Sequence, residues 1–211
     1  MALVVATMTT ATRDLLNEST AAYYTDAEIQ RWLAEAALEI SGVVKCVEAT
    51  TELALADATD HYALPTTSWE VLHVQHLPTR RGLRKLTPSM AGARDPVVSD
   101  DQPTGWWEWN GTLYVEPVPT PAAAGDHLRV YYAELTNAIT QLPEAFYADV
   151  LSYALYRGLQ KDRRYGDAAQ AFAAFVNGLA FKRVDVYQRV QHVESDLIPM
   201  QETVALSRGG T

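Results

Sequence analysis

The fold of the middle of this chain is decided by the stretch Thr104-Gly-Trp-Trp-Glu-Trp-Asn-Gly-Thr-Leu-Tyr-Val-Glu-Pro-Val-Pro119. Large apolar residues stand at every second position on both sides of the Asn110-Gly111 pair. Asn-Gly favours a type I′ turn, because both central residues of that turn take a positive φ. Pro117 and Pro119 have no N–H to donate, so the second strand should end there. The stretch therefore predicts a β-hairpin.

The same period of two continues on both sides of the hairpin. It runs through residues 51–78 and returns at Leu128-Arg-Val-Tyr-Tyr132. These segments give five to seven short strands, enough for a small antiparallel sandwich or barrel. The basic residues 79–94 are expected to form a strand or loop that leads into a short helical turn near Met90. Residues 51–135 are therefore predicted to form a β-rich lobe.

Helical periodicity marks the two ends of the chain. Thr9 to Glu18 is predicted to form a short helix, and Thr25-Asp-Ala-Glu28 has the pattern of a capping box. Behind that box, apolar residues recur at helical spacing: Ile29, Trp32, Leu33, Ala36, Ala37, Ile40, Val43, Val44 and Val47. This spacing predicts a long helix with one buried face.

Two further helices are predicted after residue 140. Pro143 suits the first turn of one of them, and the other is expected from about Asp167 to about Val193. The tail from Glu194 to Thr211 has little periodicity and should not pack in an isolated subunit. The fold class is therefore α+β: a four-helix bundle from residues 9–50 and 136–193, an inserted β-lobe and an extended docking tail.

The charge of the chain is unevenly distributed. The net charge is −9, yet residues 79–94 carry five cations and no acid, which leaves −14 for the remainder. An acidic protein does not bind nucleic acid through its overall field, because cations supply the affinity for phosphate. A basic segment can still contact DNA or an acidic partner locally, although such a segment is more often a solvated loop. The candidate contact residues are Arg80, Arg81, Arg84, Lys85 and Arg94.

No group of residues has the pattern of a catalytic or metal site. His73 and His76 are three residues apart, which places them on opposite faces of a strand. Cys46 stands among valines, as a small buried apolar residue would. The carboxylate pairs, Glu48 with Glu52 and Asp57 with Asp60, lack an apolar setting that would raise a pKa. Isolated glycines do not make a phosphate loop. We predict no catalysis, no metal and no cofactor.

The tryptophans allow a second hypothesis about the function of the chain. By strand alternation Trp107 and Trp109 share a face and Trp106 points away from them. The platform from Trp106 to Trp109 could bind a carbohydrate or nucleic-acid bases. Filling of the lobe's core, together with Trp69 and Tyr114, is the more frequent use of such residues.

Several ordered motifs resemble the head–tail adaptor, or connector, proteins of tailed bacteriophages. The resemblance covers residues 10–193. The motifs are Thr25-Asp-Ala-Glu-Ile-Gln-Arg-Trp-Leu33, Tyr62-Ala-Leu-Pro65 leading to Val71 and Val74, Trp109-Asn-Gly-Thr-Leu-Tyr-Val-Glu-Pro117, Leu128-Arg-Val-Tyr-Tyr132 and Leu142-Pro-Glu-Ala-Phe-Tyr147.

The resemblance implies a structural virion protein that is made in the host bacterial cytoplasm. Such adaptors form a ring, typically of twelve copies, which docks beneath the portal protein, surrounds the passage of the genomic DNA and contacts the next tail component. The C-terminal segment of an adaptor often inserts into clefts of the portal. In this chain that role would fall to Leu197, Ile198, Met200, Val204 and Leu206.

Two sequence features bear on membrane association. No apolar run is long enough to span a bilayer, and residues 1–8 lack the positive start of a signal peptide. We therefore expect no membrane partner. A tail-completion or stopper protein, one layer further from the capsid, is an alternative to the adaptor.

Overall fold

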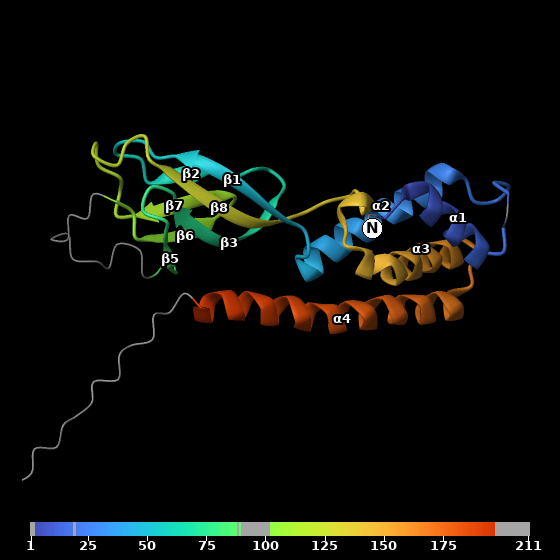
Figure 1. Ribbon diagram of the computed structural model, residues 1–211. Coiled ribbons are helices and arrows are strands. Elements are labelled where there is room, and N and C mark those ends of the chain that lie inside the picture. Colours follow the sequence, from blue (N-terminus) through green and yellow to red (C-terminus); the bar gives the residue numbers. More distant parts are fainter. Residues whose placement is uncertain (1–2, 19, 88, 90–101, 197–211) are drawn as a thin grey trace, which may run out of the picture.

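The computed structural model describes residues 3–18, 20–87, 89 and 102–196, with the side chains of residues 184–196 left out of the description. Helices occupy one end of the molecule and strands the other, and two chain segments connect the ends (Figure 1). The predicted α+β class is confirmed. We call the two ends the helical part and the β-lobe.

Both ends of the chain contribute to the helical part. The α-helices in the described residues are α1 (Val5–Leu15), α2 (Asp26–Val44), α3 (Tyr147–Lys161) and α4 (Tyr165–Asp196). Two short 3-10 helices precede α3: η1 (Ile139–Gln141) and η2 (Glu144–Phe146). The helix predicted from Asp167 thus begins two residues earlier, and the helix predicted from Thr9 begins at Val5.

The capping box at the start of α2 is confirmed. The Thr25 Oγ1 accepts a hydrogen bond from the Glu28 backbone N–H at 3.2 Å, and the Glu28 carboxylate accepts from the Thr25 N–H at 3.0 Å. Both otherwise unpaired donors are thereby satisfied. At its other end α2 stops at Val44 and not at Val47, because Lys45 takes a left-handed conformation with φ 58° and turns the chain into the β-lobe.

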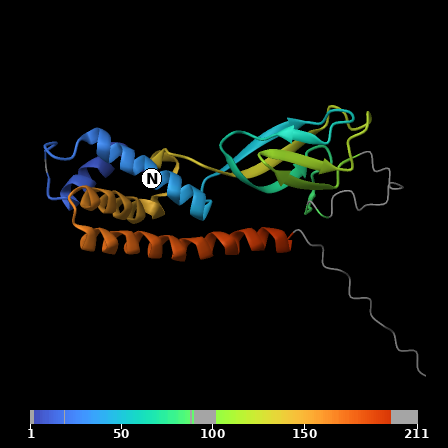
Figure 2. The ribbon, with the colours of Figure 1, turned by 180° about the vertical axis from the view of Figure 1, so that it is seen from behind.

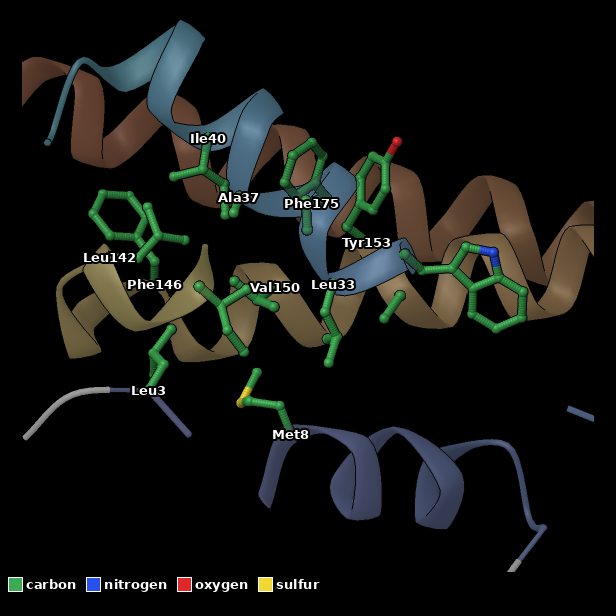
Figure 3. Close-up of a cluster of buried hydrophobic side chains, with 14 of the residues drawn as sticks. Leu3, Met8, Leu33, Ala37, Ile40, Leu142, Phe146, Val150, Tyr153 and Phe175 are labelled. Carbon is green, nitrogen blue, oxygen red and sulfur yellow. The ribbon is translucent and has the colours of Figure 1, made fainter. Parts of the chain in front are cut away.

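One apolar cluster holds the helices together. The predicted face of α2 is buried, with Trp32 3% exposed and Ile40 fully buried. Met8 of α1, Val150 of α3 and Phe175 of α4 belong to the same cluster (Figure 3). Helices from both ends of the sequence therefore depend on one another for burial of their apolar faces.

In the part of the β-lobe that the structure describes, the strands form two four-stranded sheets. Their strands are β1 (Glu48–Ala54), β2 (His61–Ala63), β3 (Ser68–His76), β4 (Arg81–Gly82), β5 (Arg84–Lys85), β6 (Gly105–Trp109), β7 (Thr112–Glu116) and β8 (His127–Glu134). The strand orders are β1-β8-β3-β4 and β2-β7-β6-β5, and every pair is antiparallel except β5–β6. Residues of both sheets share one apolar cluster, as in a small sandwich.

The predicted hairpin is β6 and β7. Asn110 and Gly111 have φ values of 50° and 71°, as a type I′ turn requires, and Trp109 pairs with Thr112 across the turn. The second strand ends at Glu116, directly before Pro117. The local chemistry of this stretch therefore determines its structure.

Two connections join the β-lobe to the helical part (Figures 1 and 2). The chain enters through Lys45, whose ammonium group pairs with the carboxylate of Glu70 on β3. It returns after β8, where the backbone N–H of Thr136 donates to the Oγ of buried Ser41 at 3.1 Å. Polar contacts thus fix both connections beside the end of α2.

Candidate interaction surfaces

An open hollow of about 440 Å³ lies in the β-lobe where β3 begins and the β6–β7 hairpin turns. Two of its tryptophans are more than half exposed: Trp69 at 52% and Trp109 at 65%. We call this site the tryptophan hollow. Its lining residues are Trp69, Lys85, Leu86, Thr87, Trp107, Glu108, Trp109 and Asn110.

The tryptophans of the β-lobe divide between core and surface. Trp106 is 1% exposed, and its indole N–H donates to the Leu83 carbonyl at 3.2 Å. Trp107 faces the other way and stacks on Tyr114, with ring centroids 5.2 Å apart and planes 7° apart. The expectation of core filling is therefore correct for Trp106 and wrong for the two exposed indoles.

A break in strand register explains why Trp69 points outward. Ser68 pairs with Glu134 and Glu70 pairs with Ala133, so Trp69 is an extra residue on β3. A bulge of this kind changes the direction in which the extra side chain points. Trp109 is exposed for a simpler reason, because it precedes the turn at the tip of the hairpin.

The basic segment lies beside this hollow. Arg81 belongs to β4, whereas Arg84 and Lys85 form β5, and all three are exposed. The Lys85 Nζ is 3.8 Å from a Glu70 carboxylate oxygen and 5.2 Å from the Trp106 ring centroid. Arg80 is exposed at a turn with φ 54°. The segment expected to be a strand or loop thus forms two very short strands.

Some of the predicted residues fall outside the described residues. They are Met90, Arg94, Leu197, Ile198, Met200, Val204 and Leu206.

Exposed apolar residues on α4 form a second surface. Tyr165, Phe172 and Val176 are 67%, 41% and 46% exposed. Their spacings of seven and four residues place them on one side of the helix. Phe181, 81% exposed, is the fourth large exposed apolar residue of α4 among the described side chains. The sequence could not show that these residues are exposed, because exposed and buried apolar residues of α4 recur at the same helical spacing.

A model of the SU10 adaptor protein family matches residues 5–194. The chain belongs to this family of phage head–tail adaptors. The match begins in α1 and ends in the last turn of α4, so it includes the tryptophan hollow and the basic segment. The resemblance read from the sequence is thereby confirmed. No curated protein matches the chain.

Membership of the adaptor family indicates the general role of the protein. The family implies a structural component of a phage virion that interacts with portal and tail proteins. None of the helices in the described residues is long and apolar enough to cross a membrane.

Some side chains of this adaptor are of types that often serve in catalytic or metal sites. Their surroundings indicate a structural role. His76 is 1% exposed and lies between the Thr79 hydroxyl, 2.8 Å from its Nδ1, and an Asp126 oxygen, 3.1 Å from its Nε2. Burial raises the pKa of the Cys46 thiol to about 11, so the thiol stays protonated at neutral pH. Within the described part of the chain, no three His, Cys, Asp or Glu side chains are grouped to hold a metal.

The paired carboxylates are also placed on the surface of the adaptor. Glu48 and Glu52 occupy exposed positions of the edge strand β1, and Glu52 binds Arg129 at 2.8 Å. Asp60 lies in a turn, 2.8 Å from the ring of His61. Glu52 and Asp60 thus take part in ion-pair contacts at the surface.

Proposed function

We propose that this chain is the subunit of a ring, a dodecamer, that docks beneath the portal and joins the capsid vertex to the tail. The ring surrounds the channel through which the double-stranded genome passes during packaging and ejection. The family match over residues 5–194 carries this proposal. The subunit acts through its shape and its neighbours and has no catalytic role.

The exposed side of α4 supports ring formation. A ring needs two different surfaces on each subunit, because its interfaces are heterologous. Apolar side chains are exposed on α4 at Phe172 and Val176, and on α1 at Val5 and Leu15. α1 packs on α2 and α3, whereas α4 packs chiefly on α3, so the two groups belong to different sides of the helical part.

The proposal also assigns a role to each part of the chain. Residues 9–50 and 136–193 form the domain that makes the ring, and residues 51–135 form an inserted lobe. The tail, residues 194–211, docks in clefts of the portal through its apolar residues. Arg80, Arg81, Arg84, Lys85 and Arg94 contact passing DNA non-specifically or an acidic neighbour.

Electron microscopy of purified particles tests the ring. We expect symmetric density of twelve copies directly below the portal. A chain that binds a tail component but never contacts the portal would instead be the stopper protein of the next layer.

A binding assay with purified portal tests the tail. The double variant Leu197→Asp and Ile198→Asp should keep its far-ultraviolet circular dichroism and lose portal binding. Val118→Asp changes an apolar residue of the β-lobe that is 46% exposed and serves as the matched control. Undiminished binding by the tail variant would refute the tail assignment.

A further inference from the structure

The tryptophan hollow lies at the end of the β-lobe that faces the helical part. Ser68 at the start of β3 pairs with Glu134, the last residue of β8, after which the chain returns to the helices. Glu70, the neighbour of Trp69, pairs with Lys45, the residue that ends α2. A segment that leaves the helical part can therefore meet the hollow without crossing the β-lobe.

The helix α4 carries the C-terminal end of the chain in this direction. Its 32 residues span about 48 Å. In Figures 1 and 2, α4 begins at the end of the helical part farthest from the strands and runs along the molecule toward the β-lobe. The residues from Leu197 to Leu206 would reach about 33 Å further in an extended form.

The chemistry of those residues matches the hollow. Residues 194–206 contain Glu194, Asp196 and Glu202 and no Lys or Arg. Leu197, Ile198 and Met200 surround Pro199. Proline biases the residue before it toward an extended conformation, and aromatic-lined grooves bind extended segments that contain proline.

The charges of the two surfaces are opposite in sign. Lys85 lines the hollow, and residues 80–85 carry four cations and no acid. Glu108, which lines the hollow, accepts a hydrogen bond from the Val71 N–H at 2.9 Å. Glu70, the neighbour of Trp69 in the chain, pairs with Lys45. An acidic apolar segment therefore meets complementary charge.

Nucleic-acid bases fit the hollow less well. Stacking on indoles tolerates any base, but single strands also need a groove of cations along their backbone. Among the lining residues that the structure describes, Lys85 is the one cation, and it lies 3.8 Å from a Glu70 oxygen.

We propose that in the free subunit the C-terminal segment Leu197–Leu206 docks in the tryptophan hollow of the same chain. Ile198, Pro199 and Met200 lie against Trp69 and Trp109, and Glu202 lies toward the basic segment. Attachment to the same chain supplies an effective concentration in the millimolar range for short linkers. This docking goes beyond the proposed function, because it gives the tail a site before any portal is present.

Disulfide trapping in the full-length chain tests the proposal without any portal. Cys46 is first replaced by Ser, and Thr87→Cys in the hollow is combined with Met200→Cys in the tail. Ala122→Cys with Met200→Cys is the control pair, since Ala122 is exposed beyond the end of β7 that is opposite the hairpin turn. We expect the Thr87 pair to close within one chain at least tenfold faster than the control, at a rate independent of protein concentration. Adding Trp69→Ala and Trp109→Ala should remove this difference.

Acrylamide quenching of tryptophan fluorescence gives a second measurement that needs no cysteine. The variant Ile198→Asp with Met200→Asp should raise the quenching constant of the full-length chain, and it should have no effect when Trp69 and Trp109 are already alanine. Equal closure rates of the two cysteine pairs, or cross-links only between subunits, would overturn the proposal. So would protection of the indoles by an oligothymidine without tail closure, because that result identifies a base-stacking site.

Discussion

Gly178 on α4 lies directly against the carboxylate of Asp149 on α3, in a position where a Cβ would collide with the Asp149 Oδ1. Asp149 is 4% exposed and pairs with the ammonium group of Lys182, one turn further along α4. The glycine thus allows the buried Asp149 carboxylate and its partly exposed Lys182 partner to lie between the two helices. A buried charge without its partner is strongly destabilising, so the geometry of this contact matters to the whole helical part.

Gly178→Ala should therefore lower the free energy of unfolding by about 1–3 kcal/mol, as overpacking of a close contact does. Gly166→Ala is the matched control in the same helix, because no atom of the described residues lies within 4 Å of a Cβ at that position. There the higher helix propensity of alanine should add up to about 1 kcal/mol. Urea denaturation followed at 222 nm measures both values. If both variants change the free energy of unfolding in the same direction, the close contact between Gly178 and Asp149 does not restrict the size of the side chain at position 178.

Trp32→Ala tests the core of the helical part. The side chain is 3% exposed and packs with its ring centroid 5.9 Å from that of Tyr24. Deletion of so large a buried side chain should cost about 3–5 kcal/mol. Trp109→Ala makes the same chemical change at a side chain that is 65% exposed, and should stay within about 0.5 kcal/mol. Comparable losses in the two variants would contradict the burial seen here.

Local chemistry explains which parts of the fold could be predicted. The capping box at Thr25 and the Asn110-Gly111 turn each depend on a few adjacent residues, and both form as their sequences indicate. The buried face of α2 follows from helical spacing alone. These features need no knowledge of distant strands.

Other features depend on contacts with segments that lie far away in the sequence. Trp69 points outward because β3 slips by one residue against β8, which lies about sixty positions away in the chain. The parallel strand pair β5–β6 is two residues long and leaves no periodic signal. Phe172 and Val176 on α4 are exposed but are spaced like core residues, so helical periodicity alone does not distinguish them from the buried face.

Glu28 predicts a specific response to acid. The Lys161 Nζ donates to both Glu28 carboxylate oxygens at 2.9 Å, and the Thr25 N–H also donates to this carboxylate. These bonds lower the pKa of Glu28 from 4.5 to about 2. A folded-state pKa below the unfolded value means that the stabilisation is complete above about pH 5 and is lost as the pH falls from 4.5 toward 2.

The variant Glu28→Gln isolates this contribution from the other acids that titrate in the same range. The difference in urea midpoint between the parent chain and the variant should be constant from pH 7 to about pH 5 and shrink toward pH 2. Glu39→Gln removes an exposed carboxylate from the same helix and is the control. A difference that persists unchanged at pH 2 would mean that Glu28 acts through packing and not through its charge.

Charge reversal tests the basic segment beside the tryptophan hollow. Arg81 and Arg84 are exposed, so Arg81→Glu with Arg84→Glu should change the free energy of unfolding by no more than about 0.5 kcal/mol per site. If these cations contact DNA or an acidic neighbour, the variant should assemble poorly or lose packaged DNA. The difference from the parent chain should be largest at low salt, where such contacts are strongest, and should shrink as the salt concentration rises. Arg31→Glu with Arg163→Glu makes the same change in net charge on exposed residues of the helical part. Particles that form and retain DNA normally with the first pair would show that the segment is solvated surface.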